Sequence, residues 1–167
     1  MTAEELLQRY EKGERDFSRI SLRRISLQGI NLNGINLSGA DLYNAHLKDI
    51  NLSNANLSGV NFLDILLEDV KLNDANLSGA ELNGATVRNS SLKRVNFEGA
   101  NLMEVGMDTV DFEGANFIRT PLNETSFYKC NLRNVLTDGD SSRALYTCYL
   151  SKTIMPEGNF VTNVIDE

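Results

Sequence analysis

A five-residue repeat runs without interruption over residues 16–134 and constrains the fold of this chain more than any other feature. Its 24 centres begin at Phe17 and are all apolar: 16 are leucine, six are phenylalanine, and the other two are Val87 and Met107. A small or β-branched residue stands two places before every centre after the first. A period of five matches neither an α-helix nor a β-strand, so the pattern indicates a repeat architecture.

A second period of twenty residues lies within the first. The string Asn-Leu-Ser-Gly recurs at 36–39, 56–59 and 76–79. Four pentapeptides therefore make one turn of a coil, and residues twenty apart stack at the strand spacing of about 4.8 Å. The centres and the residues two places before them point inward, and Gly or Asn two places after a centre suits the corners of a square. The 24 repeats predict six coils and a rod of roughly 29 Å.

Charged residues along the outer wall support this stacking. The residues Lys48, Glu68, Arg88 and Asp108 follow one another at intervals of twenty and alternate in sign. Directly stacked opposite charges are favourable, whereas like charges are unfavourable. Asp49 above Asp69 departs from the alternation, which is therefore a tendency rather than a rule.

The segment before the repeats, residues 1–14, is predicted to cap the N-terminal end of the rod with a helix over residues 2–12. Thr2 and Glu5 form a capping box, and Gly13 is a plausible stop. The apolar face of this helix is expected to cover the first coil and consists of Leu6, Leu7 and Tyr10. An open end of stacked coils exposes unpaired backbone, so a repeat protein requires such a cap.

The five-residue phase ends after Leu132, and residues 135–167 are predicted to form an irregular C-terminal cap. A short helix is expected within 138–147, beginning near Asp140 or Ser141. Apolar residues five apart then resume, shifted by three from the main register, and predict either a last irregular coil or an extended cover. These residues are Leu150, Met155, Phe160 and Ile165, with a turn signal at Pro156-Glu157-Gly158.

Composition excludes several classes of function. The net charge of −7 without a basic stripe argues against direct nucleic-acid binding. No apolar run is long enough to span a membrane, and the first ten residues lack the features of a secretory signal, so a cytoplasmic location is expected. Cys130 falls on an inward position and Cys148 lies in the tail, and a disulfide between them is unsupported in that compartment.

The sequence contains no recognisable catalytic, cofactor or metal motif. The single histidine, His46, excludes a histidine-based pair or cluster, and its place just before a centre indicates a solvated surface residue without partners. Stacked asparagines from Asn36 to Asn116 are best explained as an amide ladder that satisfies itself. We therefore expect a non-enzymatic protein with no catalytic residue, no cofactor and no metal.

One side of the rod is a candidate partner surface. It is acidic beyond Arg23 and Arg24, and outward-facing apolar side chains interrupt it. The candidate residues are Tyr43, His46, Leu63, Leu66, Met103, Asp41, Asp64, Glu81, Glu104 and Glu124. Two exposed leucines beside an exposed tyrosine favour a docking surface. The alternative is that these residues are tolerated outliers, or are pushed outward by local packing.

The blocks Ala40-Asp41-Leu42, Ala55-Asn56-Leu57 and Ala75-Asn76-Leu77 resemble the consensus Ala-(Asp/Asn)-Leu-x-x of the pentapeptide-repeat family. This resemblance covers about 120 residues, is very specific, and implies an all-β solenoid of the right-handed quadrilateral β-helix type. Such proteins abound in cyanobacteria. The family shares no catalytic residues, so the resemblance implies none here.

Two functions remain open from the sequence. The first is a non-enzymatic scaffold that presents a rigid surface to an unidentified protein partner. The second follows from the resemblance, because some family members mimic duplex DNA, bind type II topoisomerases such as gyrase and confer quinolone resistance. The acidic side favours the second function, whereas the modest net charge opposes it. We expect a monomer or a weak end-to-end dimer.

Overall fold

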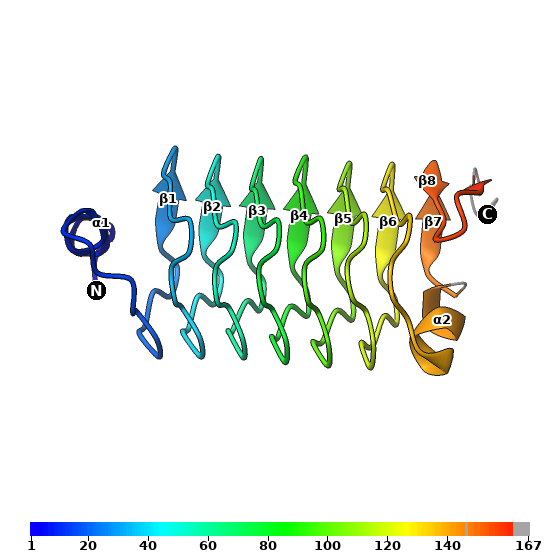
Figure 1. Cartoon of the computed structure of the whole chain (residues 1–167), viewed down its shortest axis with the longest axis horizontal. Coiled ribbons are helices and arrows are strands. Elements are labelled where there is room, and N and C mark those ends of the chain that lie inside the picture. The colour runs from blue at the N-terminus through cyan, green and yellow to red at the C-terminus, as the bar shows by residue number, and fades with distance from the viewer. Residues whose placement is uncertain (146, 162–167) are drawn as a thin grey trace.

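The computed structural model describes residues 1–145 and 147–161, and these form a rod of stacked coils between two helices (Figure 1). Seven short strands lie side by side in one parallel sheet, in the order β1 to β7. Their bounds are β1 Ser26–Gln28, β2 His46–Lys48, β3 Leu66–Glu68, β4 Thr86–Arg88, β5 Gly106–Asp108, β6 Ser126–Tyr128 and β7 Tyr149–Ser151. Each strand contributes one buried residue between two residues that face outward, which is why the strands are so short.

Residues twenty apart are paired on all four sides of the rod. The strands pair in this register, as Leu47 does with Leu67. Isolated bridges repeat it on the other three sides, for example between Asn36 and Asn56. Four pentapeptides therefore make one coil, and the six coils of a four-sided β-solenoid that the sequence predicts are confirmed. Backbone groups of successive coils satisfy one another through these bridges.

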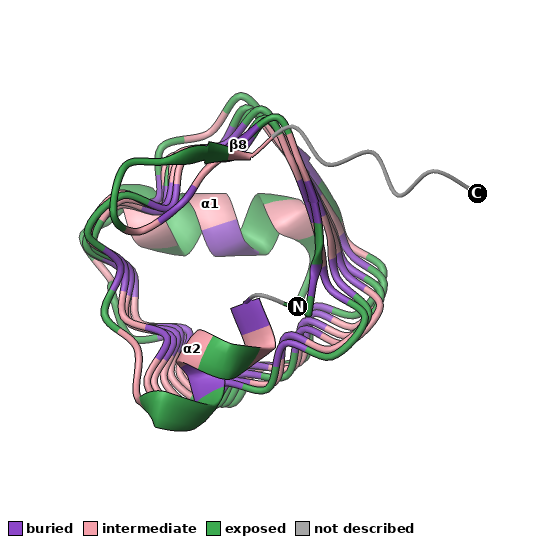
Figure 2. Ribbon diagram, turned by 90° about the vertical axis from the view of Figure 1, so that its right-hand side faces the viewer, coloured by how far each residue is buried: buried purple, intermediate pink, exposed green. Residues whose placement is uncertain are grey.

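The apolar centres fill the axis of the rod. Leu57 and Leu77 are fully buried, and the inward residues beside them are small or branched, as the repeat requires. Phenylalanines gather in the C-terminal half, where Phe97 stacks on Phe117 at 5.4 Å between ring centroids and Phe112 meets Phe127 edge-on at 5.9 Å. Figure 2 shows the buried residues on the inner side of every coil. Burial of this apolar area is the main stabilising contribution to such a fold.

The corners of the square require left-handed backbone. Gly39 and Asn44 turn corners with φ of 63° and 52°. Along three edges a hydrogen bond closes each turn, as Ala40 N–H donates to Leu37 O at 3.0 Å. The edge after the strands differs: Val70 and its stacked counterparts in the described coils make no such bond to the residue three places earlier. This fourth edge is therefore held by the pairing between coils rather than by a bond within its own turn.

Helix α1, Ala3–Glu11, closes the N-terminal end, as predicted. Glu5 N–H donates to Thr2 Oγ1 at 3.1 Å, and Thr2 N–H donates to Glu5 Oε2 at 2.8 Å, which completes the capping box. Leu6 is fully buried, while Leu7 and Tyr10 pack against the core. Viewed along the rod, α1 lies across its cross-section (Figure 2). The helix thus covers the apolar axis at this end.

At the other end the chain adds a helix and a further strand. Helix α2, Gly139–Leu145, lies within the predicted range. Because of this insertion, paired residues of the last two strands lie 23 residues apart instead of 20, and Phe127 pairs with Leu150. The resumed apolar residues therefore belong to a partial last coil, which decides between the two alternatives.

Two short strands, β8 Thr153–Ile154 and β9 Phe160–Val161, pair antiparallel after this last coil. They are joined through the predicted turn, in which Gly158 has φ of 90°. Met155 is buried, but Phe160 is 60% exposed and does not cover the axis. The predicted member Ile165 lies outside the described residues.

Candidate partner surface

The candidate surface centres on the corner that precedes β3, which we call the Leu63–Leu66 corner and define as Tyr43, His46, Leu63, Asp64 and Leu66. Leu63 precedes the corner and Leu66 begins β3 after it, while Ile65 between them points into the core and is 1% exposed. Asp64 turns the corner with φ of 55° and is exposed. The backbone therefore presents two leucines on either side of a carboxylate.

The leucines are less exposed than the sequence predicts. Leu63, Leu66, Tyr43 and Met103 are all half-buried. Stacked side chains of the coils above and below cover part of each residue, because neighbouring coils are only about 4.8 Å apart. The large apolar side chains that are classed as exposed among the described residues lie elsewhere, at Met1, Leu136, Tyr149 and Phe160.

His46 has a partner, contrary to the expectation from the sequence. It pairs in register with Leu66, and its Nε2 lies 2.8 Å from Oε2 of Glu68 at the end of the same strand. This contact is the largest cause of a lowered pKa of the Glu68 carboxyl, and the nearby charges of Lys48 and Arg88 add to it. The imidazole on β2 is thus bonded to a side chain of the neighbouring strand β3.

Tyr43 is held in a similar way by the preceding coil. The guanidinium of Arg23 lies 4.6 Å from the centroid of the Tyr43 ring. The same group donates to Asp41 Oδ2 at 2.9 Å, and Asn61 Nδ2 donates to Asp41 Oδ1 at 3.0 Å. One of the acidic candidates is therefore neutralised, and the tyrosine is fixed as a rigid part of the wall.

The structure does not bring all the predicted residues together. Met103 follows Leu63 in the same column, but Asn83 stands between them and donates through Nδ2 to Met103 O at 3.1 Å. Two coil spacings, about 10 Å, therefore separate Met103 from Leu63. Met103 lies beyond direct contact with the Leu63–Leu66 corner.

Three of the remaining acidic candidates lie in one corner column, and the fourth, Glu81, lies apart from them. Asp64, Glu104 and Glu124 turn equivalent corners with left-handed φ, are exposed, and make no ion pair within the described part of the chain. Glu81 lies on the flat of the side and accepts from Asn101 Nδ2 at 3.1 Å. The Asp64 carboxylate leans over the next corner, where its Oδ1 would lie 2.6 Å from a Cβ on Gly84.

Other polar groups of the walls bond among themselves. Asn116 Nδ2 donates to Asn96 Oδ1 at 3.0 Å, and each such oxygen also accepts from the backbone two residues later, as Asn96 does from Glu98 N–H. These contacts support the amide-ladder interpretation. The described ranges contain no group of three or more histidine, cysteine or acidic side chains placed to hold a metal ion.

Both cysteines are buried free thiols. Cys130 faces the core, and Cys148 lies just after α2, where its Sγ donates to Ala144 O of that helix at 3.2 Å. Burial raises the pKa of each thiol to about 12. Neither group is therefore a reactive nucleophile. Within residues 1–145 and 147–161, neither helix has the length and apolar character needed to cross a bilayer.

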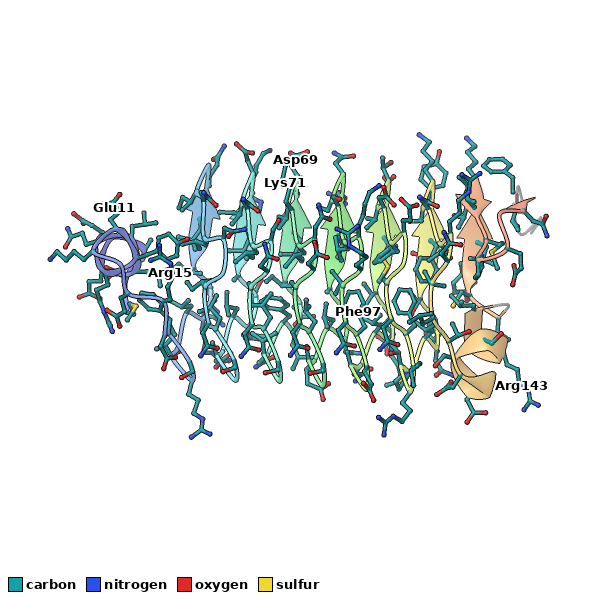
Figure 3. All side chains as sticks on the ribbon, viewed as in Figure 1. Glu11, Arg15, Asp69, Lys71, Phe97 and Arg143 are labelled. Atoms are coloured by element: carbon teal, nitrogen blue, oxygen red, sulfur yellow. The ribbon has the colours of Figure 1, made fainter. Side chains whose placement is uncertain are left out.

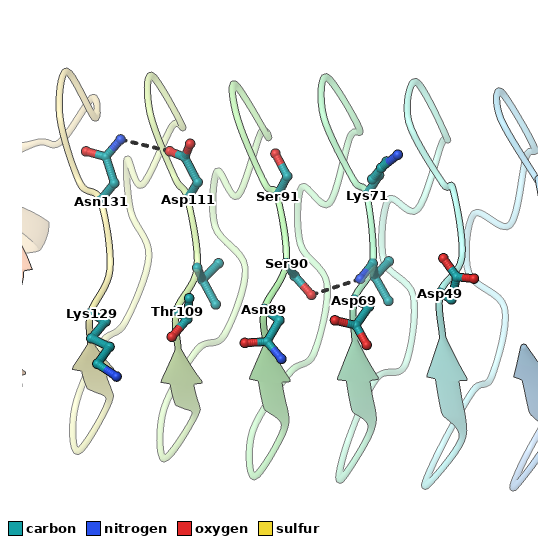
Figure 4. A pocket seen from close by; sticks show the side chains of 12 residues that line it. Asp49, Asp69, Lys71, Asn89, Ser90, Ser91, Thr109, Asp111, Lys129 and Asn131 are labelled. Carbon is teal, nitrogen blue, oxygen red and sulfur yellow. Dashed lines mark hydrogen bonds between the residues drawn. The ribbon is translucent and has the colours of Figure 1, made fainter. Parts of the chain in front are cut away.

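One feature of the surface was missed from the sequence. A groove of about 590 Å³ runs along the side of the rod that follows the strands (Figure 4). One wall is the column of corner residues that includes Asp69, and the other is the column two residues later along the chain, which includes Lys71. Ser90 lies at its floor, where its Oγ accepts from Val70 N–H at 3.0 Å and donates to Arg88 O at 2.7 Å. The corner wall could have been found from the sequence, because its residues lie two places after the repeat centres at intervals of twenty, as Asp49 and Asp69 do. Figure 4 shows Asp69 and Lys71 on opposite walls of the groove, and Figure 3 shows where the two side chains lie on the rod.

The comparison with protein families agrees with this architecture. The model described as "Pentapeptide repeats (8 copies)" matches residues 20–59, 35–74, 71–105 and 109–135. The chain therefore belongs to the pentapeptide-repeat family. No curated protein matches it.

Several solved structures are similar. HetL, a pentapeptide-repeat protein involved in heterocyst differentiation regulation from the cyanobacterium Nostoc sp. strain PCC 7120, is 22% identical over 96% of this chain and 100% of its own, with a TM-score of 0.33. QnrB1, a plasmid-mediated fluoroquinolone resistance protein, is 14% identical over 84% and 70%, with a TM-score of 0.56. Rfr23 from the cyanobacterium Cyanothece 51142 is 22% identical over 80% and 94%, with a TM-score of 0.42. At these identities the likeness concerns the fold alone.

Proposed function

We propose that this pentapeptide-repeat protein is a non-enzymatic scaffold that binds a protein partner through the Leu63–Leu66 corner. The observation that carries the proposal is the pair of half-buried leucines on either side of exposed Asp64. Some other coils hold polar residues at the equivalent wall positions, such as Asn83 and Asn123 for Leu63, and Thr86 and Ser126 for Leu66. The apolar side chains of this coil are therefore not a requirement of the fold.

The surroundings of the corner support this proposal. Protein interfaces place an apolar centre within a polar rim, and aromatic residues and arginine are enriched in them. Here the ion pair between Arg23 and Asp41 and the contact between His46 and Glu68 lie beside the leucines. These contacts pre-order the rim side chains, which lowers the entropic cost of binding. The outlying candidates Met103, Glu81, Glu104 and Glu124 would extend the contact along the acidic side.

Affinity capture from the native host lysate tests this function, with bound proteins identified by mass spectrometry. We expect the double variant Leu63→Lys and Leu66→Lys to lose a partner that the native chain retains. The matched control, Ser53→Lys and Ser58→Lys, adds the same charge on other walls and should retain that partner. Equal capture by all three chains would overturn the proposal. The predicted cytoplasmic location is consistent with the free thiols of Cys130 and Cys148.

A DNA-mimic binder of a type II topoisomerase is the second candidate, and the acidic column of Asp64, Glu104 and Glu124 favours it. These carboxylates, with Gly84 between the first two, resemble the phosphates of a duplex in the sign of their charge. The candidate predicts that the chain inhibits DNA supercoiling by gyrase, and that reversing the three acidic charges abolishes the effect. Unchanged supercoiling with a large excess of the native chain would exclude it.

A further inference from the structure

The wall of the groove that contains the corner residues has its charges segregated along the rod. In stacking order this wall consists of Asp49, Asp69, Asn89, Thr109, Lys129 and Lys152. All six residues have left-handed φ between 49° and 58° and are exposed, so their side chains project from one straight edge. The wall is therefore acidic toward the N-terminal end, neutral in the middle and basic toward the C-terminal end.

This segregation is unfavourable for the isolated chain. Like charges that stack directly on each other repel, and both ends of the wall contain such a pair. The neighbouring column alternates in sign, with Glu68 next to Lys48 and Arg88. None of the four charged residues of the wall makes an ion pair with another described residue. The two lysines do lie over the Tyr128 ring of their own chain, with Nζ of Lys129 4.9 Å and Nζ of Lys152 5.4 Å from its centroid. The stability of a single rod thus gives no reason for the stacked aspartates at the acidic end.

From this wall we infer that two copies of the chain pack side by side and antiparallel, with the corner walls of their grooves in contact. A two-fold axis between Asn89 and Thr109 would reverse one rod relative to the other. It would then place Asp49 opposite Lys152 of the second copy, and Asp69 opposite its Lys129. Each of these contacts occurs twice in a symmetric pair.

The adjacent column fits the same symmetry. Within the column that contains Lys48, Glu68, Arg88 and Asp108, the same axis places Arg88 opposite Asp108 of the second copy. A parallel arrangement would instead oppose Asp with Asp and Lys with Lys, which is repulsive. The charges therefore select one orientation. Figure 4 shows the row of corner side chains from Asp49 to Lys129 that would face the second copy.

Two other corners of the rod do not offer this complementarity. The corner column with Asp74 and Arg94 is already neutralised within the chain, where Arg94 Nε donates to Asp74 Oδ1 at 2.7 Å. The column of Gly39, Gly59, Gly79 and Gly99 has no side chains over four coils. Because the proposed contact is dominated by charge, it is salt-sensitive: a Debye length of about 3 Å at 1 M salt screens it.

Sedimentation velocity of the full chain tests the pairing. We expect a dimer at low ionic strength that dissociates at about 1 M salt. Asp69→Lys and Lys129→Asp should each raise the dissociation constant at least about tenfold, since each substitution creates two repulsive contacts. The double variant and an equimolar mixture of the two single variants should both restore the dimer, because opposite charges then face each other again. Circular dichroism and thermal unfolding confirm that each variant is folded.

Mixed disulfide formation tests the orientation. An antiparallel pair predicts that Asn89→Cys and Thr109→Cys chains cross-link to each other when mixed, more than either does alone. Self-cross-linking of each variant in preference to the mixture would contradict the antiparallel arrangement. A chain that stays monomeric at low salt, or a dimer insensitive to both charge reversals, would overturn the inference.

Discussion

Nε2 of His46 lies 2.8 Å from Oε2 of Glu68, a contact that runs diagonally from the start of β2 to the end of β3. Diagonal neighbours on adjacent strands are within reach of long side chains. The contact places the only histidine of the chain beside Leu66 and gives the Leu63–Leu66 corner a fixed polar edge.

Replacing His46 is expected to raise the pKa of Glu68. In the native chain the hydrogen bond from His46 is the first cause of a lowered carboxyl pKa, and Lys48 and Arg88 lower it further. In His46→Ala the pKa should rise toward the ordinary value of about 4.3, because partial burial of the carboxyl also raises it. An NMR titration of the Glu68 side-chain carboxyl measures this directly, and an unchanged pKa would show that the contact is absent in solution.

The same shift fixes the sign of a pH effect on stability. Because the folded pKa of Glu68 is lower than the unfolded one, its carboxylate stabilises the fold above the ordinary glutamate pKa and loses that contribution as the pH falls below it. The native chain should therefore lose more stability than His46→Ala between about pH 5 and about pH 3, the range in which the carboxyl takes up its proton. Urea unfolding of both chains at the two pH values provides the comparison.

Removal of the N-terminal cap should loosen helix α1. Thr2→Ala deletes the acceptor of the Glu5 N–H and is expected to cost about 1 kcal/mol of helix stability. Because α1 is a terminal element, faster amide exchange at Leu6 and Leu7 is the most sensitive readout. Thr2→Ser retains the hydroxyl and should exchange as the native chain does. Equal exchange in Thr2→Ala would mean that the capping box contributes nothing.

Two corner glycines form a matched pair for a test of wall crowding. A Cβ on Gly84 would lie 2.6 Å from Asp64 Oδ1, whereas a Cβ on Gly59 would meet nothing within 4 Å; their φ values are 71° and 61°. Gly59→Ala should lower the free energy of unfolding by about 1 kcal/mol through its left-handed backbone alone. Gly84→Ala should lower it further, and adding Asp64→Ala should remove the excess. Chemical denaturation measures all three, and equal losses for the two glycines would contradict the crowding.

The thiols should be inert in the folded chain. Since burial raises the pKa of Cys130 and of Cys148 to about 12, almost no thiolate exists near neutral pH. A thiol-reactive chromophore should modify neither residue under native conditions and both after denaturation. Rapid reaction of the native chain would show that this end of the rod opens.

The repeat contains enough information to predict the coil but not the contacts on its walls. Leu57 and Leu77 are repeat centres twenty residues apart, so the period alone places them at the same inward position of successive coils. The cap at Thr2 is predictable because it is a local sequence motif. The bond from His46 to Glu68 spans 22 residues, so a comparison at intervals of twenty does not find it. It depends on side-chain length and rotamer, which the repeat does not determine.

The C-terminal end shows a similar limit. The shift by three residues is visible in the sequence at Leu150, but its cause is the insertion of α2 between two paired strands. The half-burial of Leu63 and Leu66 was also not predicted, because an outward direction does not give the exposure that stacked neighbours leave. The sequence thus predicted the outward direction of these leucines and overestimated their exposure.

Hydroxyl-radical footprinting of the chain, free and in a captured complex, tests the central claim most directly. The account predicts that oxidation of Tyr43, Leu63 and Leu66 decreases in the complex. Leu136 and Phe160, which are 56% and 60% exposed on other parts of the rod, should keep their reactivity. Protection of Leu136 or Phe160 with unchanged oxidation of Tyr43, Leu63 and Leu66 would contradict it.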